Sequence, residues 1–134
     1  MKKRILGLDI GEKRIGVAIS DASQTIAREL EIIQVANQKQ ALQEIAKICS
    51  ENNIEKIIVG LPLNSDGEDT EQTKRVRNFV EKIKNYEIEF IDERFTSQQA
   101  LKIQQKVGMK AKKSKKNLDS LAAVIILQTY LDSL

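Results

Sequence analysis

Three carboxylates are the strongest candidates for chemistry in this sequence: Asp9, Glu93 and Asp119. Asp9 interrupts the apolar run 5–10 (ILGLDI), and a carboxylate in a central strand is costly unless it is paired or bound to a metal ion. Glu93 belongs to the triplet 92–94 (DER), which follows another apolar run, and Asp119 lies in the first turn of an apolar helical segment. Two strand-end carboxylates and one helix carboxylate suit an all-oxygen Mg²⁺ or Mn²⁺ site for phosphoryl chemistry.

Each of these acids, taken alone, also has an ordinary structural explanation. Asp9 could cap the turn at Gly11, and the triplet 92–94 could be solvated in a loop. Asp119 could interact favourably with the positive end of a helix dipole. The three together are more specific than any one of them, because a common edge of a sheet would bring them to one place.

The composition removes several classes of enzyme. The chain of 134 residues contains no histidine and a single cysteine, Cys49. Ser-His-Asp and Cys-His catalysis, histidine acid–base chemistry and most zinc enzymes are therefore excluded. An intrachain disulfide is also excluded, and Cys49 is best explained as a small core residue because it lies on an apolar helical stripe. Carboxylates, amines, hydroxyls and oxygen-bound metal ions remain available for chemistry.

The basic residues are concentrated in segment 106–116, which holds six lysines and no acid. The remaining chain is acidic, because it keeps 16 of the 22 basic residues against 19 acidic ones. A cationic segment on an otherwise acidic protein suits binding to a phosphate backbone. A solvated loop that only improves solubility explains the same lysines equally well.

Polar residues elsewhere could contact the same substrate. Lys13 and Arg14 lie close to Asp9 and could bind phosphate, unless they form only an exposed hairpin tip. Segment 60–67 (GLPLNSDG) could line a cleft after an apolar strand, although Asp66-Gly67 is better explained as a turn. The candidate substrate-binding residues are Lys13, Arg14, Asn64, Arg94, Lys112, Lys113, Lys115 and Lys116.

Apolar periodicity predicts the elements that position these residues. The run 56–61 (KIIVGL) is continuously apolar, as in a strand covered on both faces. Segment 121–123 (LAA) suits close packing of a helix on a sheet. In chain order the pattern predicts strands at 5–10, 14–20 and about 25–35, a helix from the N-cap Asn37 to a stop at Asn52-Asn53, a strand at 56–61, a helix through 76–83, a strand at 88–91, a helix from the capping box 96–99 through 107, and a final helix capped by Asn117.

The predicted order is β-β-β-α-β-α-β-α-α, which makes a mixed five-stranded sheet flanked by helices in one domain over residues 1–134. Sites in such sheets form where the carboxyl ends of parallel strands meet at a topological switch point. Apolar stretches are too short to span a membrane, and the N-terminus leads straight into a strand without a cleavage-site pattern. We therefore expect a cytoplasmic protein.

Four motifs, in order along nearly the whole chain, resemble those of the YqgF/RuvX family. The resemblance implies a ribonuclease H-like fold related to Holliday-junction resolvases. Two departures, Phe95 for a frequent Leu and Ser97 for a common Thr, do not affect a proposed metal ligand. The motifs are 8–18 (LDIGEKRIGVA) with 20–21, 59–64 (VGLPLN) with 66–67, 92–96 (DERFT) with Ala100, and 119–123 (DSLAA) with 126–127 and 130–131.

The resemblance also implies an activity, a metal-dependent nuclease that matures the 5′ end of precursor 16S ribosomal RNA. It places the catalytic, metal-binding acids at Asp9, Glu93 and Asp119. The expected cofactor is Mg²⁺ or Mn²⁺, and the expected partners are precursor ribosomal RNA and the precursor of the small ribosomal subunit. We expect no membrane association, and a monomer or weak dimer.

Other functions remain to be separated from this one. A DNA-junction resolvase needs two active sites on one junction, so an obligate dimer would favour DNA and a monomer would favour RNA. A non-catalytic nucleic-acid-binding factor would gain nothing from three acids in a phosphate-facing cleft. An ATPase of the actin and sugar-kinase type shares the D-x-G pattern of the first hairpin, but its two-lobed cleft cannot be built from 134 residues.

Overall fold

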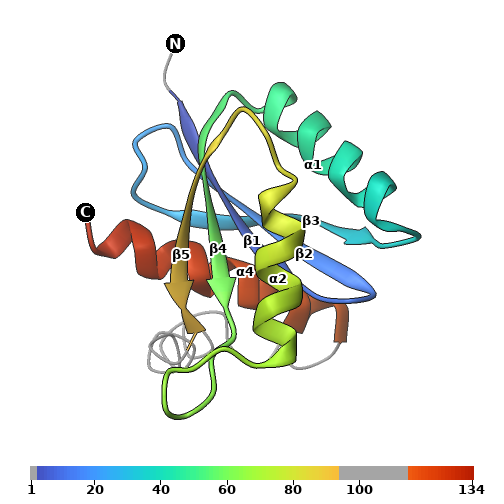
Figure 1. The fold of residues 1–134 in the computed structure, drawn as a ribbon. Helices are drawn as coiled ribbons and strands as arrows, with labels where there is room; N and C mark the ends of the chain where they lie inside the picture. The colour runs from blue at the N-terminus through green and yellow to red at the C-terminus, as the bar shows by residue number, and fades with distance from the viewer. Residues whose placement is uncertain (1–2, 94–114) are drawn as a thin grey trace.

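The computed structural model describes the backbone of residues 3–93 and 115–134, and the side chains of residues 3–93 and 121–134. The five predicted strands are confirmed, and Figure 1 shows them in one mixed sheet. The predicted helix from 96 to 107 lies outside the described residues. The described elements are β1 (Arg4–Ile10), β2 (Arg14–Ser20), β3 (Ala27–Gln34), α1 (Gln38–Glu51), β4 (Ile54–Leu61), α2 (Glu71–Glu81), β5 (Glu87–Asp92) and α4 (Lys115–Asp132).

The strand order is β3-β2-β1-β4-β5. Strands β1, β4 and β5 are parallel to one another, whereas β2 is antiparallel to both β1 and β3. The carboxyl ends of β1, β4 and β5 therefore lie at the same edge of the sheet, called here the carboxyl edge. From β1 the chain adds β2 and β3 on one side of the sheet, and then β4 and β5 on the other side. The predicted switch point therefore lies at β1, whose carboxyl end belongs to the carboxyl edge.

Helices cover both faces of the sheet, with α1 and α2 on one side and α4 on the other (Figure 1). In β4, Ile57 and Val59 pack in the α1/α2 core, and Ile58 packs in the α4 core. This alternation confirms that the apolar run 56–61 forms a strand buried on both faces. No helix in the described parts of the chain is long and apolar enough to cross a membrane.

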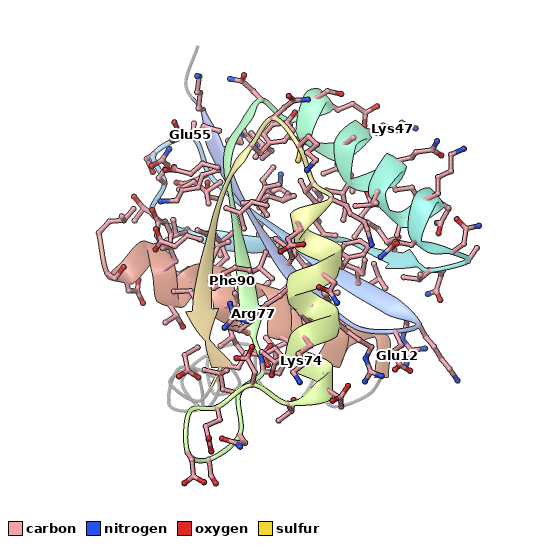
Figure 2. All side chains as sticks on the ribbon, viewed as in Figure 1. Glu12, Lys47, Glu55, Lys74, Arg77 and Phe90 are labelled. Carbon is pink, nitrogen blue, oxygen red and sulfur yellow. The ribbon has the colours of Figure 1, made fainter. Side chains whose placement is uncertain are left out.

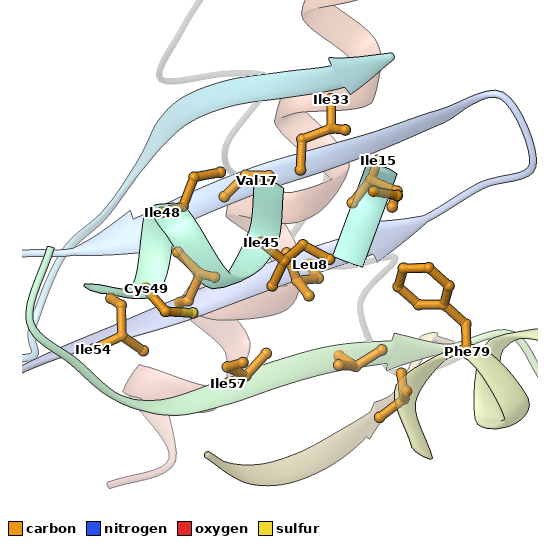
Figure 3. Close-up of a cluster of buried hydrophobic side chains, with 14 of the residues drawn as sticks. Leu8, Ile15, Val17, Ile33, Ile45, Ile48, Cys49, Ile54, Ile57 and Phe79 are labelled. Atoms are coloured by element: carbon orange, nitrogen blue, oxygen red, sulfur yellow. The ribbon is translucent and has the colours of Figure 1, made fainter. Parts of the chain in front are cut away.

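Figure 3 shows the α1/α2 core, in which Cys49 packs near Ile54. Cys49 is 1% exposed, which confirms its predicted place in the core. Burial raises the pKa of the thiol to about 11, because the apolar surroundings disfavour the thiolate. The predicted N-cap of this helix is also confirmed, since Asn37 Oδ1 accepts a 2.8 Å hydrogen bond from the backbone N–H of Gln40.

A buried hydroxyl fixes the start of α2 to the end of β4. Thr70 and Thr73 form a capping box, and Thr73, which is fully buried, donates its hydroxyl hydrogen to the carbonyl oxygen of Pro62. Pro62 directly follows β4. This hydrogen bond therefore anchors the N-terminus of α2 at the carboxyl edge of the sheet.

Helix α4 crosses the opposite face of the sheet and contacts all five strands (Figure 1). Ile126 lies over Gly60 near the end of β4, and Lys56 near its start donates a 3.0 Å hydrogen bond to the hydroxyl of Tyr130. The first turns of α4 are therefore directed toward the carboxyl edge. The helix begins at Lys115, so the prediction that Asn117 caps it is wrong; the lysines before it are better helix formers than asparagine and extend the helix.

Gly7 allows α4 to approach the sheet closely. A Cβ atom at this position would lie 2.7 Å from Leu127 Cβ and 3.2 Å from the carbonyl oxygen of Ala123. Ala123 and Leu127 are both fully buried. The close helix-to-sheet packing predicted from segment 121–123 is thereby confirmed.

We predict that Gly7→Ala lowers the free energy of unfolding by about 1–3 kcal/mol, because the methyl group overpacks the contact with α4. Urea denaturation measures this change. In a double-mutant cycle, Leu127→Gly removes the Cβ atom that the new methyl group would meet, so the two substitutions together should cost less than the sum of their separate effects. Additive effects would contradict the proposed contact.

Candidate active site

Asp9 and Glu93 lie on the α4 face of the sheet, at the carboxyl edge. Asp9 is two residues after Gly7 in β1, and Glu93 directly follows β5, two residues after Ile91, which packs against the α4 core. Successive side chains of a strand alternate between faces, so each acid shares the face of the residue two positions before it. Both acids are half-buried. The structure thus brings together two of the three predicted acids.

A hydrogen bond joins the carboxyl groups of Asp9 and Glu93. The pKa of Glu93 is raised from 4.5 to about 7, first by burial and then by the negative charge of Asp9, the hydrogen bond and the charge of Asp92. Two carboxylates this close repel each other when both are ionised. At neutral pH the pair therefore favours a shared proton or a bound cation.

Gly60 leaves the space that Glu93 occupies. Strand β4 lies between β1 and β5, and Gly60 pairs with Ile91 of β5. A Cβ atom at Gly60 would lie 2.7 Å from Glu93 Oε1 and would also clash with the Ile126 side chain. From the sequence, Gly60 was considered only as the start of a loop that could contact substrate. The available signal was a glycine inside an otherwise apolar strand, which often marks a close approach.

The third predicted acid, Asp119, lies on α4, four residues before Ala123 and seven before Ile126. At 1.5 Å per residue, the backbone of Asp119 is about 10 Å further along α4 than Ile126, toward the carboxyl edge. Its side chain lies outside the described residues. Convergence of Asp119 with Asp9 and Glu93 therefore stays a prediction.

The predicted substrate-binding residues other than Asn64 fall into three groups. Lys13 is exposed in the β1–β2 turn, and Arg14 is half-buried at the start of β2. Both line a cavity that Asp9 also lines, so the structure brings them to the same edge as the acids. Lys115 and Lys116 lie in the first turn of α4, and nothing is described of their side chains. Arg94, Lys112 and Lys113 lie outside the described residues.

Asn64 organises its own loop. Its Oδ1 accepts backbone hydrogen bonds from Asp66 at 3.0 Å and from Glu68 at 2.9 Å. The backbone N–H of Gly67 donates to the carbonyl of Asn64, and Gly67 has a φ of 81°, a conformation that favours glycine. The turn predicted at Asp66-Gly67 is confirmed, and contact of Asn64 with substrate stays a prediction.

We predict that the metal-free protein loses stability as the pH rises from about 4.5 to above 7. In this range the folded state retains a proton at Glu93 that the unfolded state releases, so unfolding becomes more favourable with increasing pH. In EDTA, the fall in melting temperature between pH 5 and pH 8 should be smaller for Asp9→Asn than for the wild type, because the substitution removes the repelling charge.

Asp92→Asn is the matched control for this measurement. Asp92 makes the smallest contribution to the raised pKa of Glu93, so its amide variant should retain more of the pH dependence than Asp9→Asn. Equal pH dependence in the wild type and in Asp9→Asn would show that the two carboxyl groups do not interact.

Similar folds occur in nucleic-acid enzymes of known structure. A structure of Thermus thermophilus RuvC in complex with Holliday junction substrate matches with a TM-score of 0.63, covering 98% of this chain and 94% of that one at 14% identity. A complex of the Fowlpox virus resolvase with Holliday junction DNA matches with a TM-score of 0.59, covering 97% of each chain at 17% identity. These similarities confirm the ribonuclease H-like fold.

The sequence comparisons identify the family. The model of the RuvX family, described as Holliday junction resolvase, matches residues 3–133. Two relatives are named "Putative pre-16S rRNA nuclease". One, from a Sulfurihydrogenibium species, is 48% identical, covering 98% of this chain and 91% of its own length. The other, from Thermoanaerobacter pseudethanolicus, is 45% identical, covering 97% and 96%. The chain therefore belongs to the RuvX family of nucleases.

Proposed function

We propose that this protein is a divalent-metal-dependent endonuclease that processes the 5′ end of precursor 16S ribosomal RNA. The observation that carries the proposal is the hydrogen-bonded carboxyl pair of Asp9 and Glu93 at the carboxyl edge. The names of the relatives support the RNA substrate. Such an enzyme would work in the cytoplasm, on the precursor of the small ribosomal subunit.

The residues of the site fit a hard divalent cation. The donors are carboxylate oxygens, which Mg²⁺ and Mn²⁺ prefer, and the chain has no histidine to favour other metals. The raised pKa of Glu93 comes from burial and from the negative charge of Asp9, and a bound cation would stabilise the ionised form of both groups. Asp9 and Glu93 would hold the cation together with Asp119. When bound, Mg²⁺ or Mn²⁺ supplies positive charge that stabilises the charge developing at a phosphodiester.

The protein's own contribution is to position these groups before substrate arrives. Asp9 pairs with Gly16 of β2, Gly60 pairs with Ile91 of β5, and Glu93 directly follows β5. The sheet therefore fixes the backbone beside each of the two carboxyl groups. Lys13 and Arg14 lie beside them on the first hairpin and would hold a phosphate of the substrate. Arg94 and the lysine segment would hold the flanking backbone.

A second candidate function is cleavage of DNA junctions. The family description names it, and both of the structural neighbours described above are bound to junction DNA. A resolvase must place two active sites on one junction, whereas a single cut in RNA needs only one. A monomer or weak dimer in solution would support the RNA substrate, and an obligate dimer would support the DNA junction. Sedimentation analysis with and without a four-way junction distinguishes these two oligomeric states.

We predict that purified protein cleaves precursor 16S ribosomal RNA in the presence of Mg²⁺ or Mn²⁺, and that Asp9→Asn abolishes cleavage without lowering the melting temperature. The amide keeps the size of the side chain and removes its charge. Gel analysis of end-labelled precursor RNA and four-way DNA junctions, under the same conditions, identifies the substrate. Wild-type turnover by Asp9→Asn would overturn the assignment of the site.

Gly60→Ala and Glu93→Gln extend this test to the second carboxyl group. The added methyl group would displace the Glu93 carboxyl, so turnover should fall in both variants while RNA binding is retained. Calorimetric titration with Mn²⁺ should show weaker binding for Glu93→Gln and Asp119→Asn. Metal titrations that match the wild type in both amide variants would contradict a three-carboxylate site.

We predict that replacing Lys112, Lys113, Lys115 and Lys116 with Gln weakens RNA binding more than it lowers turnover at saturating RNA. These residues would hold substrate without acting at the bond that breaks. The slope of log affinity against log salt concentration should fall by about 0.7 for each lost single-strand phosphate contact. An unchanged slope would show that the lysines only increase solubility.

A further inference from the structure

The cavity that Asp9, Lys13 and Arg14 line extends over the α1/α2 side of the sheet, opposite α4. It is a cleft of about 900 Å³ between the β1–β2 turn, the start of α1 and one side of α2, called here the α2 cleft. Its apolar lining includes Ile10, Val35 and Phe79, which belong to or pack against the α1/α2 core. Its volume lies within the range of about 300–1,000 Å³ that is typical of ligand sites.

Basic side chains surround the α2 cleft. Lys13 and Arg14 line it from the hairpin, together with the acids Asp9 and Glu12. Arg75 lines it from α2, and Lys82 lines it from just after α2. Arg75 Nη1 lies 3.0 Å from Glu12 Oε1, so an ion pair links α2 to the hairpin, where Figure 2 shows Glu12 beside the helix. Both side chains of this pair are more than 60% exposed, which leaves them accessible to a ligand.

Neutral hydrogen-bonding groups alternate with these charges. Gln72 and Asn78 of α2 line the cleft and are exposed. At the other end, Lys82 donates a 3.1 Å hydrogen bond to Oε1 of Gln38, which connects α2 to the first residue of α1. The cleft thus combines cations, amides and an apolar surface within one volume.

The α2 cleft is continuous with the candidate active site. Asp9, whose carboxyl group bonds to Glu93 on the α4 face, also lines the α2 cleft. The β1–β2 turn with Lys13 and Arg14 lies between the two surfaces. A chain of phosphates bound at the carboxyl pair can therefore continue around this turn into the cleft.

We propose that the α2 cleft binds a single-stranded segment of the nucleic-acid substrate that flanks the bond cut at the Asp9–Glu93 pair. This inference rests on the proposed nuclease function and extends the substrate contact from Lys13 and Arg14 to Arg75 and Lys82 on the α1/α2 side. Phosphates bind the basic side chains, and the bases lie on the apolar surface within reach of Gln72 and Asn78.

The chemistry of the lining distinguishes a single strand from a double helix. In a duplex the bases are stacked and paired inside, so a protein cleft mainly meets the phosphates. A single strand exposes base faces and edges, which match the apolar surface and the amides of the cleft. Four cations against two acids also leave the lining net positive, which matches a polyanion better than an uncharged ligand.

The experiment measures binding of short single-stranded RNA and DNA by fluorescence anisotropy in EDTA, with Asp9→Asn as the parent protein so that no cleavage occurs. The test variant adds Arg75→Gln and Lys82→Gln. The control variant adds Lys74→Gln and Lys84→Gln, which make the same charge change on exposed residues at or just after α2 that do not line the cleft. Melting temperatures confirm that all three proteins are folded.

We expect the test variant to bind single strands roughly tenfold more weakly than the control, with a salt slope smaller by about 1.4 for two lost phosphate contacts. Adding a single-stranded extension to a blunt duplex should raise the affinity of the parent and the control but not that of the test variant. Weaker binding of either RNA or DNA by the test variant supports the proposal. The nucleic acid that the parent protein binds more tightly is then the one that occupies the cleft.

Equal affinity and equal salt slope of the test and control variants, for both RNA and DNA, would overturn the proposal. This result is separate from failure of the proposed function, which is measured as cleavage in metal by the protein with an intact Asp9. If the protein is an active nuclease and its affinity for single-stranded nucleic acid does not depend on Arg75 and Lys82, the α2 cleft would bind another ligand, such as an acidic protein segment.

Discussion

The contact of α4 with two residues that lack side chains, Gly7 and Gly60, determines where the functional groups of this molecule lie. At Gly7 the helix occupies the space that a methyl group would need. At Gly60 the absence of a Cβ atom leaves room for both Ile126 and Glu93. The helix is thereby held against the parallel strands, with its first turns directed toward the edge that carries Asp9. A larger residue at either position would separate groups that must meet. The site therefore depends on packing of the α4 face as much as on its acids.

The carboxyl pair and the cations of the α2 cleft lie on opposite faces of the sheet, and Asp9 and Glu12 line the cleft as well. The carboxyl pair is half-buried on the α4 face, where the raised pKa of Glu93 shows the cost of its burial. The cations of the hairpin and α2 lie around a cleft on the other face. Strand β1 connects these surfaces, since its last residues contribute to both. A phosphate chain that meets the cations first would be guided toward the acids, which would otherwise repel it.

Sequence patterns predicted most of the fold because local interactions specify it. The continuously apolar run 56–61 indicated a strand covered on both faces, and Asn37 indicated the start of α1. Asp9 was a candidate because a carboxylate in an apolar strand is costly, and Glu93 was one because it follows another apolar run. Convergence of Asp119 with them stays a prediction. Gly60 and the α2 cleft were not found, because each depends on which residues lie opposite in space. Arg75 is more than 60 positions from Glu12 in sequence, and no local pattern indicates their ion pair.

The burial of Cys49 has a practical consequence for observing the protein at work. The only thiol of the chain is enclosed in the core, and its raised pKa keeps it protonated at neutral pH, so thiol-specific dyes should not react with it. The wild-type chain is therefore a ready background for single-site labelling. Asp66 is exposed at the tip of a loop whose neck is closed by the Leu63–Asp69 bridge. A cysteine introduced there would carry a fluorophore close to the carboxyl edge and report the arrival and departure of substrate in real time.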